Sequence, residues 1–473
     1  MITVYLDWNA MSTLKRGAFP ELLQLLTNKE KFLLYYSTSH VSDIYSSYSE
    51  DEEQLKIIKE DFDFITLLTN NVCLANNGKE ISINDYEPKE LLEDNISNSE
   101  LFSNISFDSI FKILEENKMF SPMVGMMKSM LSNISMGNEF KEAFSNPESA
   151  KVMNTLFPNM PANPTIIDIF NSSGNLYKNL NEKEDYKELR NMVQKIGVNS
   201  GIYNNKNPFD VIDNAYKNYG LDLNSVYKQD SKNAPEWFNN ITTEYLKLDM
   251  HGYKSDEIKV TDKKKKTFKN TTEDSFHTAF ASTCDFYITF DKKNYAKTTE
   301  VYKKLNINTI VLNKAEEFIE HYNKYLCFDN FIESLVRIFE IIKNEEFEKL
   351  KYKDSEEYLL SHISKYYFLN FFNKVMYEVL DEAGNYRIIL SKDVATNHIN
   401  FLIKELRNLV NLLVNNFGIS DANNNSYFKD EEIKENENWI GRVWGFDIFT
   451  IHLITVYEKV QLYINVPCRN VTT

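Results

Sequence analysis

Two short apolar runs near the start of the chain predict buried β-strands. They cover Ile2–Leu6 and 31–36, and the pattern between them over 10–28 is that of a helix. After the second run, Ser39 is placed to cap another helix, which continues past Asp43. Strands that alternate with helices in this way are typical of an α/β fold with a parallel sheet.

A second block with the same pattern lies more than two hundred residues further along the chain. Apolar runs at 286–290 and 307–312 predict two more strands, and helical patterns surround them at 272–283, 295–305 and 314–326. We expect this block and the N-terminal one to contribute to a single sheet.

The remaining stretches favour helices. Between about 51 and 245, helical patterns alternate with loops rich in Asn and Ser, and a structureless loop of that length is not expected in a folded protein. Beyond Cys327 the pattern is mostly helical, most clearly at 397–416, for which Gly418 is the expected C-cap. We therefore predict an α/β fold, in which a parallel sheet flanked by helices carries a large helical insertion over 71–244. A mostly helical C-terminal domain is expected over 327–473.

Composition supports a folded chain of two or three domains. The chain has 473 residues, of which 42% are hydrophobic, enough to build several cores. No apolar run reaches the roughly 18 residues that a membrane span needs, and neither the four cysteines nor the seven histidines show zinc-ligand spacing. No charged leader precedes the first strand, so a cytoplasmic protein with reduced thiols is the expectation, without contact to a membrane.

Four aspartates stand at positions where the predicted fold brings them together. Asp7 and Asp291 follow predicted strands, and the carboxyl ends of parallel strands share one edge of a sheet. Asp43 and Asp274 lie in the first turns of predicted helices, which begin at that same edge. Each residue taken alone is more often a cap or a turn residue. Together, four carboxylates need a cation, and oxygen ligands favour Mg²⁺ or Mn²⁺, which supports phosphodiester hydrolysis.

The surrounding residues make a resemblance specific. The stretch TEDSFHTAFASTCDFYITFD over 272–291 resembles the C-terminal half of PIN domains, in which a helix opens with Asp and an apolar strand ends in Thr-x-Asp. At the N-terminus, VYLDWN over 4–9 resembles the first strand of that family. The stretch YSTSHVSDI over 36–44 is similar to its second strand and the following helix, where the family usually has Glu and this chain has Asp43.

The resemblance covers about 1–70 and 245–326, which would form one discontinuous nuclease domain. It implies that Asp7, Asp43, Asp274 and Asp291 hold Mg²⁺ or Mn²⁺ and catalyse hydrolysis. It further implies a metal-dependent endonuclease, an endoribonuclease acting on single-stranded RNA. A toxin or an antiviral defence effector is the setting that the family suggests, with a regulatory protein partner or a second copy bound through the helical regions.

Neighbouring residues have two interpretations each. Asn9 and Thr289 could steady a metal-bound water or a ligand carboxylate, or could be turn residues. His277 lies one helical turn after Asp274 and could contact the scissile phosphate. A packed, hydrogen-bonded histidine is favoured, because a site for a hard metal does not need imidazole.

Charge distribution decides where a nucleic acid could bind. The formal net charge is −16, which argues against a general nucleic-acid surface. Between Lys254 and Lys304, however, the sequence contains 12 lysines and 8 acidic residues. The run Lys263, Lys264, Lys265 and Lys266 is the predicted contact for substrate phosphates, with a solvated loop as the equally weighted alternative.

Three alternatives to a nuclease stay open. The first is a PIN-like scaffold that no longer cuts, for which Asp43 in place of Glu is the only support. The second is a phosphatase of the haloacid dehalogenase type, whose chemistry calls for a second acid where this chain has Asn9. The third is a ligand-sensing module that binds a nucleotide through the C-terminal helices, as an added role.

Overall fold

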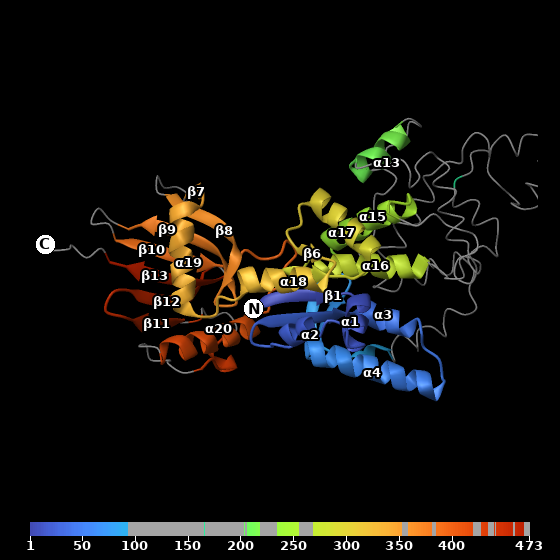
Figure 1. The fold of residues 1–473 in the computed structure, drawn as a ribbon, viewed down its shortest axis with the longest axis horizontal. Coiled ribbons are helices and arrows are strands. Elements are labelled where there is room, and N and C mark those ends of the chain that lie inside the picture. The colour runs from blue at the N-terminus through green and yellow to red at the C-terminus, as the bar shows by residue number, and fades with distance from the viewer. Residues whose placement is uncertain are drawn as a thin grey trace, which may run out of the picture.

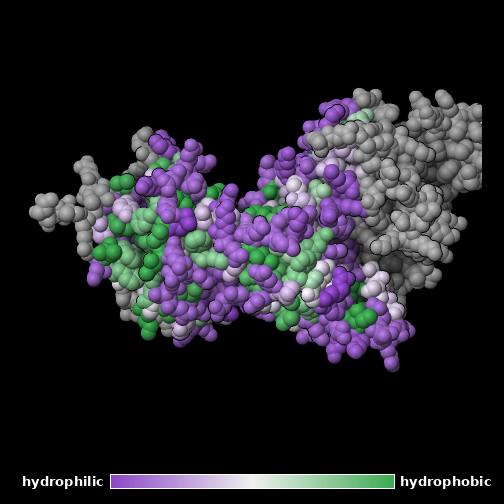
Figure 2. All heavy atoms as spheres, in the orientation of Figure 1, coloured by the Kyte–Doolittle hydropathy of each residue, from purple (hydrophilic) through white to green (hydrophobic). Residues whose placement is uncertain are grey.

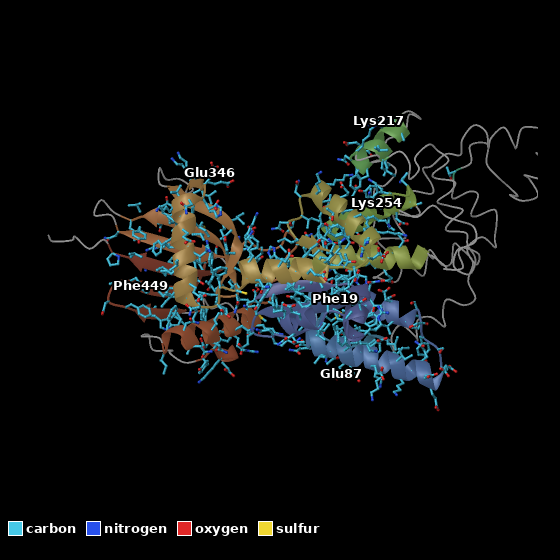
Figure 3. All side chains as sticks on the ribbon, in the orientation of Figure 1. Phe19, Glu87, Lys217, Lys254, Glu346 and Phe449 are labelled. Carbon is cyan, nitrogen blue, oxygen red and sulfur yellow. The ribbon has the colours of Figure 1, made fainter. Side chains whose placement is uncertain are left out.

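The computed structural model describes residues 1–92, 165, 203, 206–217, 234–254, 268–351, 358–380, 385–419, 427–433, 439, 441–456 and 459–467. These residues form two domains that each contain one sheet (Figure 1). Side chains fill the space between sheet and helices in both of them (Figure 3). Within these ranges no helix is long and apolar enough to cross a membrane.

The first sheet combines strands from the N-terminal segment and from the later segment that was expected to share its sheet. Its order is β4 (Ile81–Asp85), β3 (Val72–Asn76), β2 (Phe32–Ser37), β1 (Ile2–Leu6), β5 (Phe286–Ile288) and β6 (Ile310–Leu312). All neighbours pair in parallel except β3 and β4, so the sheet is mixed and not purely parallel as predicted. The strand β1 is central because it pairs with β2 on one side and with β5 on the other.

Helices cover both faces of this sheet and make the α/β domain a three-layer structure. Alternate residues of β1 enter two different cores: Val4 and Leu6 pack on one face, and Tyr5 packs on the other. One face is covered by α1 (Trp8–Lys15), α2 (Pro20–Leu26), α4 (Glu52–Thr69) and α18 (Ala315–His321). The other is covered by α13 (Pro208–Lys217), α15 (Glu236–Met250), α16 (Phe268–Ala281) and α17 (Lys292–Leu305).

The C-terminal domain differs from the prediction. The region 327–473 was expected to be mostly helical, but its described part is built on a seven-stranded antiparallel sheet. The order of that sheet is β11 (Arg442–Gly445), β12 (Thr450–Val456), β13 (Lys459–Val466), β10 (Tyr386–Ser391), β9 (Phe372–Val379), β8 (Tyr358–Phe368) and β7 (Glu348–Lys351). Two helices pack against it, α19 (Phe331–Asn344) and α20 (Leu402–Phe417).

The residue pattern of this sheet explains the error. In β13, Val460, Leu462 and Ile464 are buried while their neighbours are not, which is the period of two that one-sided strands show. The strong helix near 397–416 is present as α20 and ends at Gly418, whose φ of 80° suits glycine at that C-cap. One well-formed amphipathic helix therefore does not make its surroundings helical.

Candidate active site

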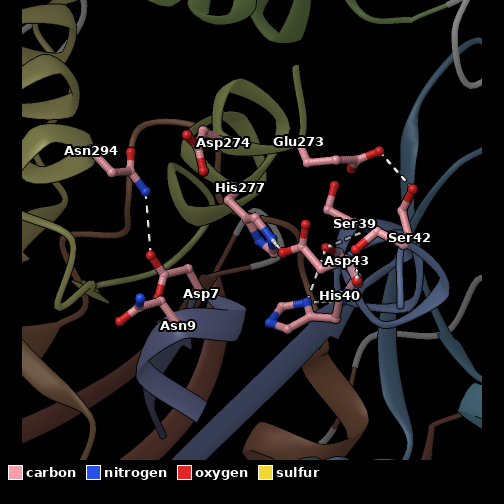
Figure 4. Close-up of polar contacts among 12 residues, drawn as sticks. Asp7, Asn9, Ser39, His40, Ser42, Asp43, Glu273, Asp274, His277 and Asn294 are labelled. Atoms are coloured by element: carbon pink, nitrogen blue, oxygen red, sulfur yellow. Dashed lines mark hydrogen bonds and ion pairs between the residues drawn. The ribbon is translucent and has the colours of Figure 1, made fainter. Parts of the chain in front are cut away.

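Asp7 occupies the point where the central strand β1 becomes helix α1. Its backbone is extended, and its Oδ1 accepts a hydrogen bond from the backbone N–H of Ala10 at 2.8 Å, so it caps the helix. Its Oδ2 accepts from Thr289 Oγ1 at 2.5 Å and from Asn294 Nδ2 at 3.3 Å (Figure 4). The side chain is 4% exposed. Three donor atoms thus hold a buried carboxylate at the end of the strand.

Asp291 likewise follows a strand, β5, and caps the next helix. Its Oδ1 accepts from the backbone N–H groups of Lys293 at 2.7 Å and Asn294 at 3.2 Å, which makes it the N-cap of α17. Thr289 connects the two acids, because its hydroxyl donates to Asp7 and accepts from the backbone N–H of Asp291 at 3.2 Å. Thr289 was a candidate either for steadying a water or carboxylate at a metal or for a turn residue, and in the structure its hydroxyl contacts the Asp7 carboxylate.

The two acids lie where the strand order changes direction. From β1 the chain builds β2 and β3 on one side of the sheet, and later β5 and β6 on the other. Ligands in open α/β sheets bind outside the carboxyl ends of strands at such a point. Asp7 and Asp291 follow the two adjacent strands that flank it.

Asp43 reaches this edge from the helix α3 (Thr38–Tyr45). Its Oδ2 lies 3.0 Å from His277 Nε2 of α16, and the dashed line in Figure 4 marks this pair. The other ring nitrogen, Nδ1, is 2.8 Å from the hydroxyl of Tyr5, which in turn lies 2.6 Å from Ser37 Oγ. Both nitrogens of a fully buried ring are engaged, so the favoured interpretation of His277 as a packed, hydrogen-bonded residue describes this arrangement.

Asp274 belongs to α16, which begins at Phe268, so Asp274 lies in the second turn and not in the first as predicted. The protein around it removes solvation and raises the pKa of its carboxyl well above the usual range. Lys297 opposes this shift, whereas Asp43 and Asp291 add to it. The charges of Asp43 and Asp291 are therefore close enough to Asp274 to oppose its ionisation.

Burial also raises the pKa of Asp7. The charge of His277, the Thr289 hydroxyl and the backbone N–H of Ala10 act in the opposite direction, and Asp43 adds to the rise. All four predicted aspartates thus sit in one electrostatic neighbourhood, with Asp43 acting on both Asp7 and Asp274.

The residues of this neighbourhood have the chemistry of ligands for a divalent cation, but their side chains are not arranged to hold one. Within the described ranges, no group of three or more His, Cys, Asp or Glu side chains stands close enough to hold a metal ion. Asp7 is turned toward Thr289 and Asn294, and Asp43 toward His277. The donors themselves are carboxylate oxygens that repel one another, which is the set that Mg²⁺ or Mn²⁺ prefers. A cation at this edge would relieve the repulsion.

One predicted contact lies elsewhere, and another falls outside the described residues. Asn9 is exposed, and Figure 4 places its side chain on the side of Asp7 away from Asp43. The lysine run 263–266 falls outside the described residues.

Sequence reasoning missed several polar groups that support the site. Asn294 follows Asp291 by three positions in the first turn of α17, a spacing that could have drawn notice. Ser42 Oγ donates to Glu273 Oε1 at 2.6 Å and joins α3 to α16. Lys297 also forms a buried ion pair with Asp249, which the sequence could not reveal because the two residues lie on different helices.

Comparisons with protein-family models, with curated proteins and with solved structures find no match to this chain.

Proposed function

We propose that this chain is a metal-dependent nuclease of the PIN-like kind, and that its substrate is single-stranded RNA. The observation that carries the proposal is the placement of Asp7 and Asp291 at the carboxyl ends of the adjacent strands β1 and β5. Asp43 and Asp274 act electrostatically on the same group of acids. The four acids come from separate segments, and the carboxyl edge of an α/β sheet is where such a sheet binds its ligand.

In this proposal Asp7, Asp43, Asp274 and Asp291 hold Mg²⁺ or Mn²⁺. Such an ion, when bound, supplies an activated water and a stabilised leaving oxygen for phosphodiester hydrolysis. Thr289 and Asn294 keep Asp7 in place from the neighbouring strand and helix, at 2.5 Å and 3.3 Å. Preformed hydrogen bonds of this kind orient the ligands of a metal and reduce the reorganisation that catalysis requires.

RNA as the substrate rests on the resemblance to PIN domains and on the local excess of lysine over acidic residues between Lys254 and Lys304. Lys263, Lys264, Lys265 and Lys266 precede α16 in the chain, the helix that carries Asp274. In this proposal they contact phosphates next to the cut. A role as a toxin or a defence effector extends the same analogy.

A PIN-like scaffold without activity is the second candidate. The pairing of Asp43 with His277 favours it, because a carboxylate held by a buried imidazole is less available to a metal. The two candidates differ in one outcome, which is whether the purified chain cuts RNA.

The test is cleavage of labelled single-stranded RNA by the full chain with Mg²⁺ or Mn²⁺, with and without excess EDTA. We expect cleavage that chelation abolishes and that Asp7→Asn removes. Asp63→Asn is the matched control, since Asp63 is exposed on α4 away from the sheet edge. Cleavage that persists in EDTA, or an Asp7→Asn variant that cuts as fast as wild type, would reject the proposal. A folded wild type that cuts nothing would favour the scaffold.

A further inference from the structure

A cavity of about 330 Å³ lies between the two domains. The residues that line it do not include the four aspartates of the candidate active site. The domains meet at a narrow waist in Figure 2, where β8 contacts the short helix Tyr322–Leu326 that follows α18. The α/β domain contributes Asp285, His321 and Tyr325 to the walls, and the C-terminal domain contributes Lys365 and Asp393. Interfaces between domains are common places for small-molecule sites, and this volume falls within their usual range of roughly 300–1,000 Å³.

Two backbone irregularities converge on this cavity. The helix α18 ends at His321 and continues as a π-helix over Tyr322–Leu326, which contains Tyr325. On the opposite wall, the pairing of β8 with β9 shifts register between Ile363 and Phe368. Short π-helices and β-bulges both occur preferentially beside functional sites, where they re-aim side chains. The two features arise in different domains, so they are independent of each other.

The buried wall offers an aromatic surface and one unsatisfied nitrogen. The ring of His321 lies 5.1 Å from that of Phe286 and 4.9 Å from that of Tyr325. Its Nε2 is buried and has no hydrogen-bond partner among the described residues. An unsatisfied buried polar atom costs free energy, and a ligand whose complementary group reached this nitrogen after a small shift of the ring would recover it. Burial lowers the pKa of His321 to about 4, so the ring is neutral at physiological pH.

The outer wall carries positive charge. Lys365 and Lys324 are exposed, and both act electrostatically on His321, so they lie near the cavity. The acid in the inner wall, Asp285, is neutralised by Lys392 at 3.2 Å. Asp393 remains as a partly exposed carboxylate, and a carboxylate at such a position can accept hydrogen bonds from sugar hydroxyls.

We infer that the interdomain cavity binds a mononucleotide, with its base against His321 and Tyr325 and its phosphate at Lys365. A planar heterocycle suits the aromatic wall and carries both donors and acceptors for the histidine nitrogen. A phosphate suits the exposed lysines. The inference is independent of the nuclease proposal, because it concerns only binding.

The cavity is also placed to influence the aspartates. Asp285 directly precedes β5, and its Oδ2 accepts hydrogen bonds from the backbone N–H of Thr3 at 2.8 Å and from its hydroxyl at 2.9 Å. The same two strands, β1 and β5, end at Asp7 and Asp291. A nucleotide in the cavity would thus lie beside Asp285, which connects the amino ends of the two strands whose carboxyl ends carry the acids.

The test is isothermal titration of the full chain with AMP, GMP, CMP and UMP, with the four nucleosides, and with inorganic phosphate. We expect at least one mononucleotide to bind and its nucleoside to bind roughly tenfold more weakly, since the lost charged contact is of that size. His321→Phe keeps a ring of similar shape and should weaken binding by about tenfold through loss of the nitrogen. His362→Phe is the matched control, because His362 lies on β8 outside the cavity, with its ring 5.4 Å from that of Phe347.

Lys365→Ala keeps the test informative if the histidine variant folds poorly. This exposed residue should tolerate substitution, and its loss should weaken the nucleotide while leaving nucleoside binding unchanged. Absence of binding by every nucleotide and nucleoside would overturn the inference. So would phosphate that binds as tightly as the nucleotides, or wild-type affinity in both His321→Phe and Lys365→Ala.

Discussion

Asp7 combines burial, charge and a fixed position, and this combination makes its contribution to stability depend on pH. Its pKa in the folded protein lies above its value in the unfolded chain, because burial disfavours the charged form. Its contribution to stability is therefore fully present below the unfolded pKa and is lost as the pH rises through the folded pKa. Above that range the metal-free protein has lost this contribution, because burial opposes ionisation of the carboxyl.

Asp7→Asn should accordingly raise the Tm of the metal-free protein at neutral pH. The amide cannot ionise, and asparagine caps a helix about as well as aspartate. The gain should shrink as the pH is lowered toward the range in which the wild-type carboxyl is protonated. Thermal unfolding measured across pH in EDTA checks this, with Asp63→Asn as the exposed control. A Tm that falls equally at every pH would show that Asp7 is a structural cap and not a strained acid.

His277 joins Asp43 to Tyr5 and so determines where the second acid of the site can stand. Burial by itself would lower the pKa of His277, but the hydrogen bond and charge of Asp43 outweigh it and raise the pKa. In the proposed nuclease the histidine acts on catalysis through Asp43, which makes it a positioning residue.

This arrangement predicts non-additive effects on RNA cleavage. Asp43→Ala and His277→Ala should each lower kcat by about tenfold or more, and the double variant should be no slower than the slower single one. His277→Gln keeps a hydrogen-bonding group and should recover part of the rate lost in His277→Ala. Losses that multiply in the double variant would mean that the two residues act separately.

At the scale of elements, the site is made by the ends of strands and the starts of helices. Asp291 caps α17 in the way that Asp51 caps α4, where its Oδ2 accepts from the backbone N–H of Gln54 at 3.2 Å. The two caps are alike in their local structure, but only one of them lies at the sheet edge with the other acids.

Asp291→Ala and Asp51→Ala therefore form a matched pair. Each should cost about 1 kcal/mol of unfolding free energy, the usual cost of a lost N-cap. Only Asp291→Ala should abolish cleavage. Denaturant unfolding and the cleavage assay together check this. Equal activity in the two variants would remove Asp291 from the site.

The elements differ in how far the sequence could predict them. Strand β1 and Asp7 were predictable because an uninterrupted apolar run is followed at once by a polar cap. Asp274 was assigned to a first turn, since nothing in the sequence marks Phe268 as the helix start. The antiparallel strands of the C-terminal domain were missed because alternation in short segments such as β12 is a weaker signal than the strong helix α20. Side-chain pairs across elements, such as Asp43 with His277, depend on tertiary packing that one sequence does not encode locally.

At the scale of the whole molecule, a buried ion pair fastens the two domains together. Lys392 Nζ, on the C-terminal domain, lies 3.2 Å from Asp285 Oδ2 and donates to the backbone oxygen of Met1 at 2.9 Å. Burial alone would raise the pKa of Asp285, but the charge of Lys392 and the hydrogen bonds from Thr3 outweigh it and lower the pKa. The stability that this acid contributes is present above its unfolded pKa and is lost as the pH falls through its folded pKa.

Lys392→Met should destabilise the protein by about 3 kcal/mol, because it leaves the buried Asp285 carboxylate without its partner. Asp285→Asn combined with Lys392→Met should recover part of that loss. Lys343→Met serves as the control, since Lys343 is exposed on α19. Chemical unfolding followed by tryptophan fluorescence measures all three. Equal stability of Lys392→Met and wild type would show that the ion pair contributes nothing to holding the domains.

The most direct measurement of the central claim is Mn²⁺ binding to the full chain, followed by the loss of the free-ion signal in electron paramagnetic resonance. Wild type should bind Mn²⁺, Mg²⁺ should compete for it, and Asp7→Asn and Asp291→Asn should each weaken binding by at least about tenfold, as loss of a charged ligand would. Asp63→Asn should bind as wild type does. Wild-type protein that binds no Mn²⁺, or affinity that both site variants retain, would contradict the assignment of these acids to a metal-dependent nuclease site.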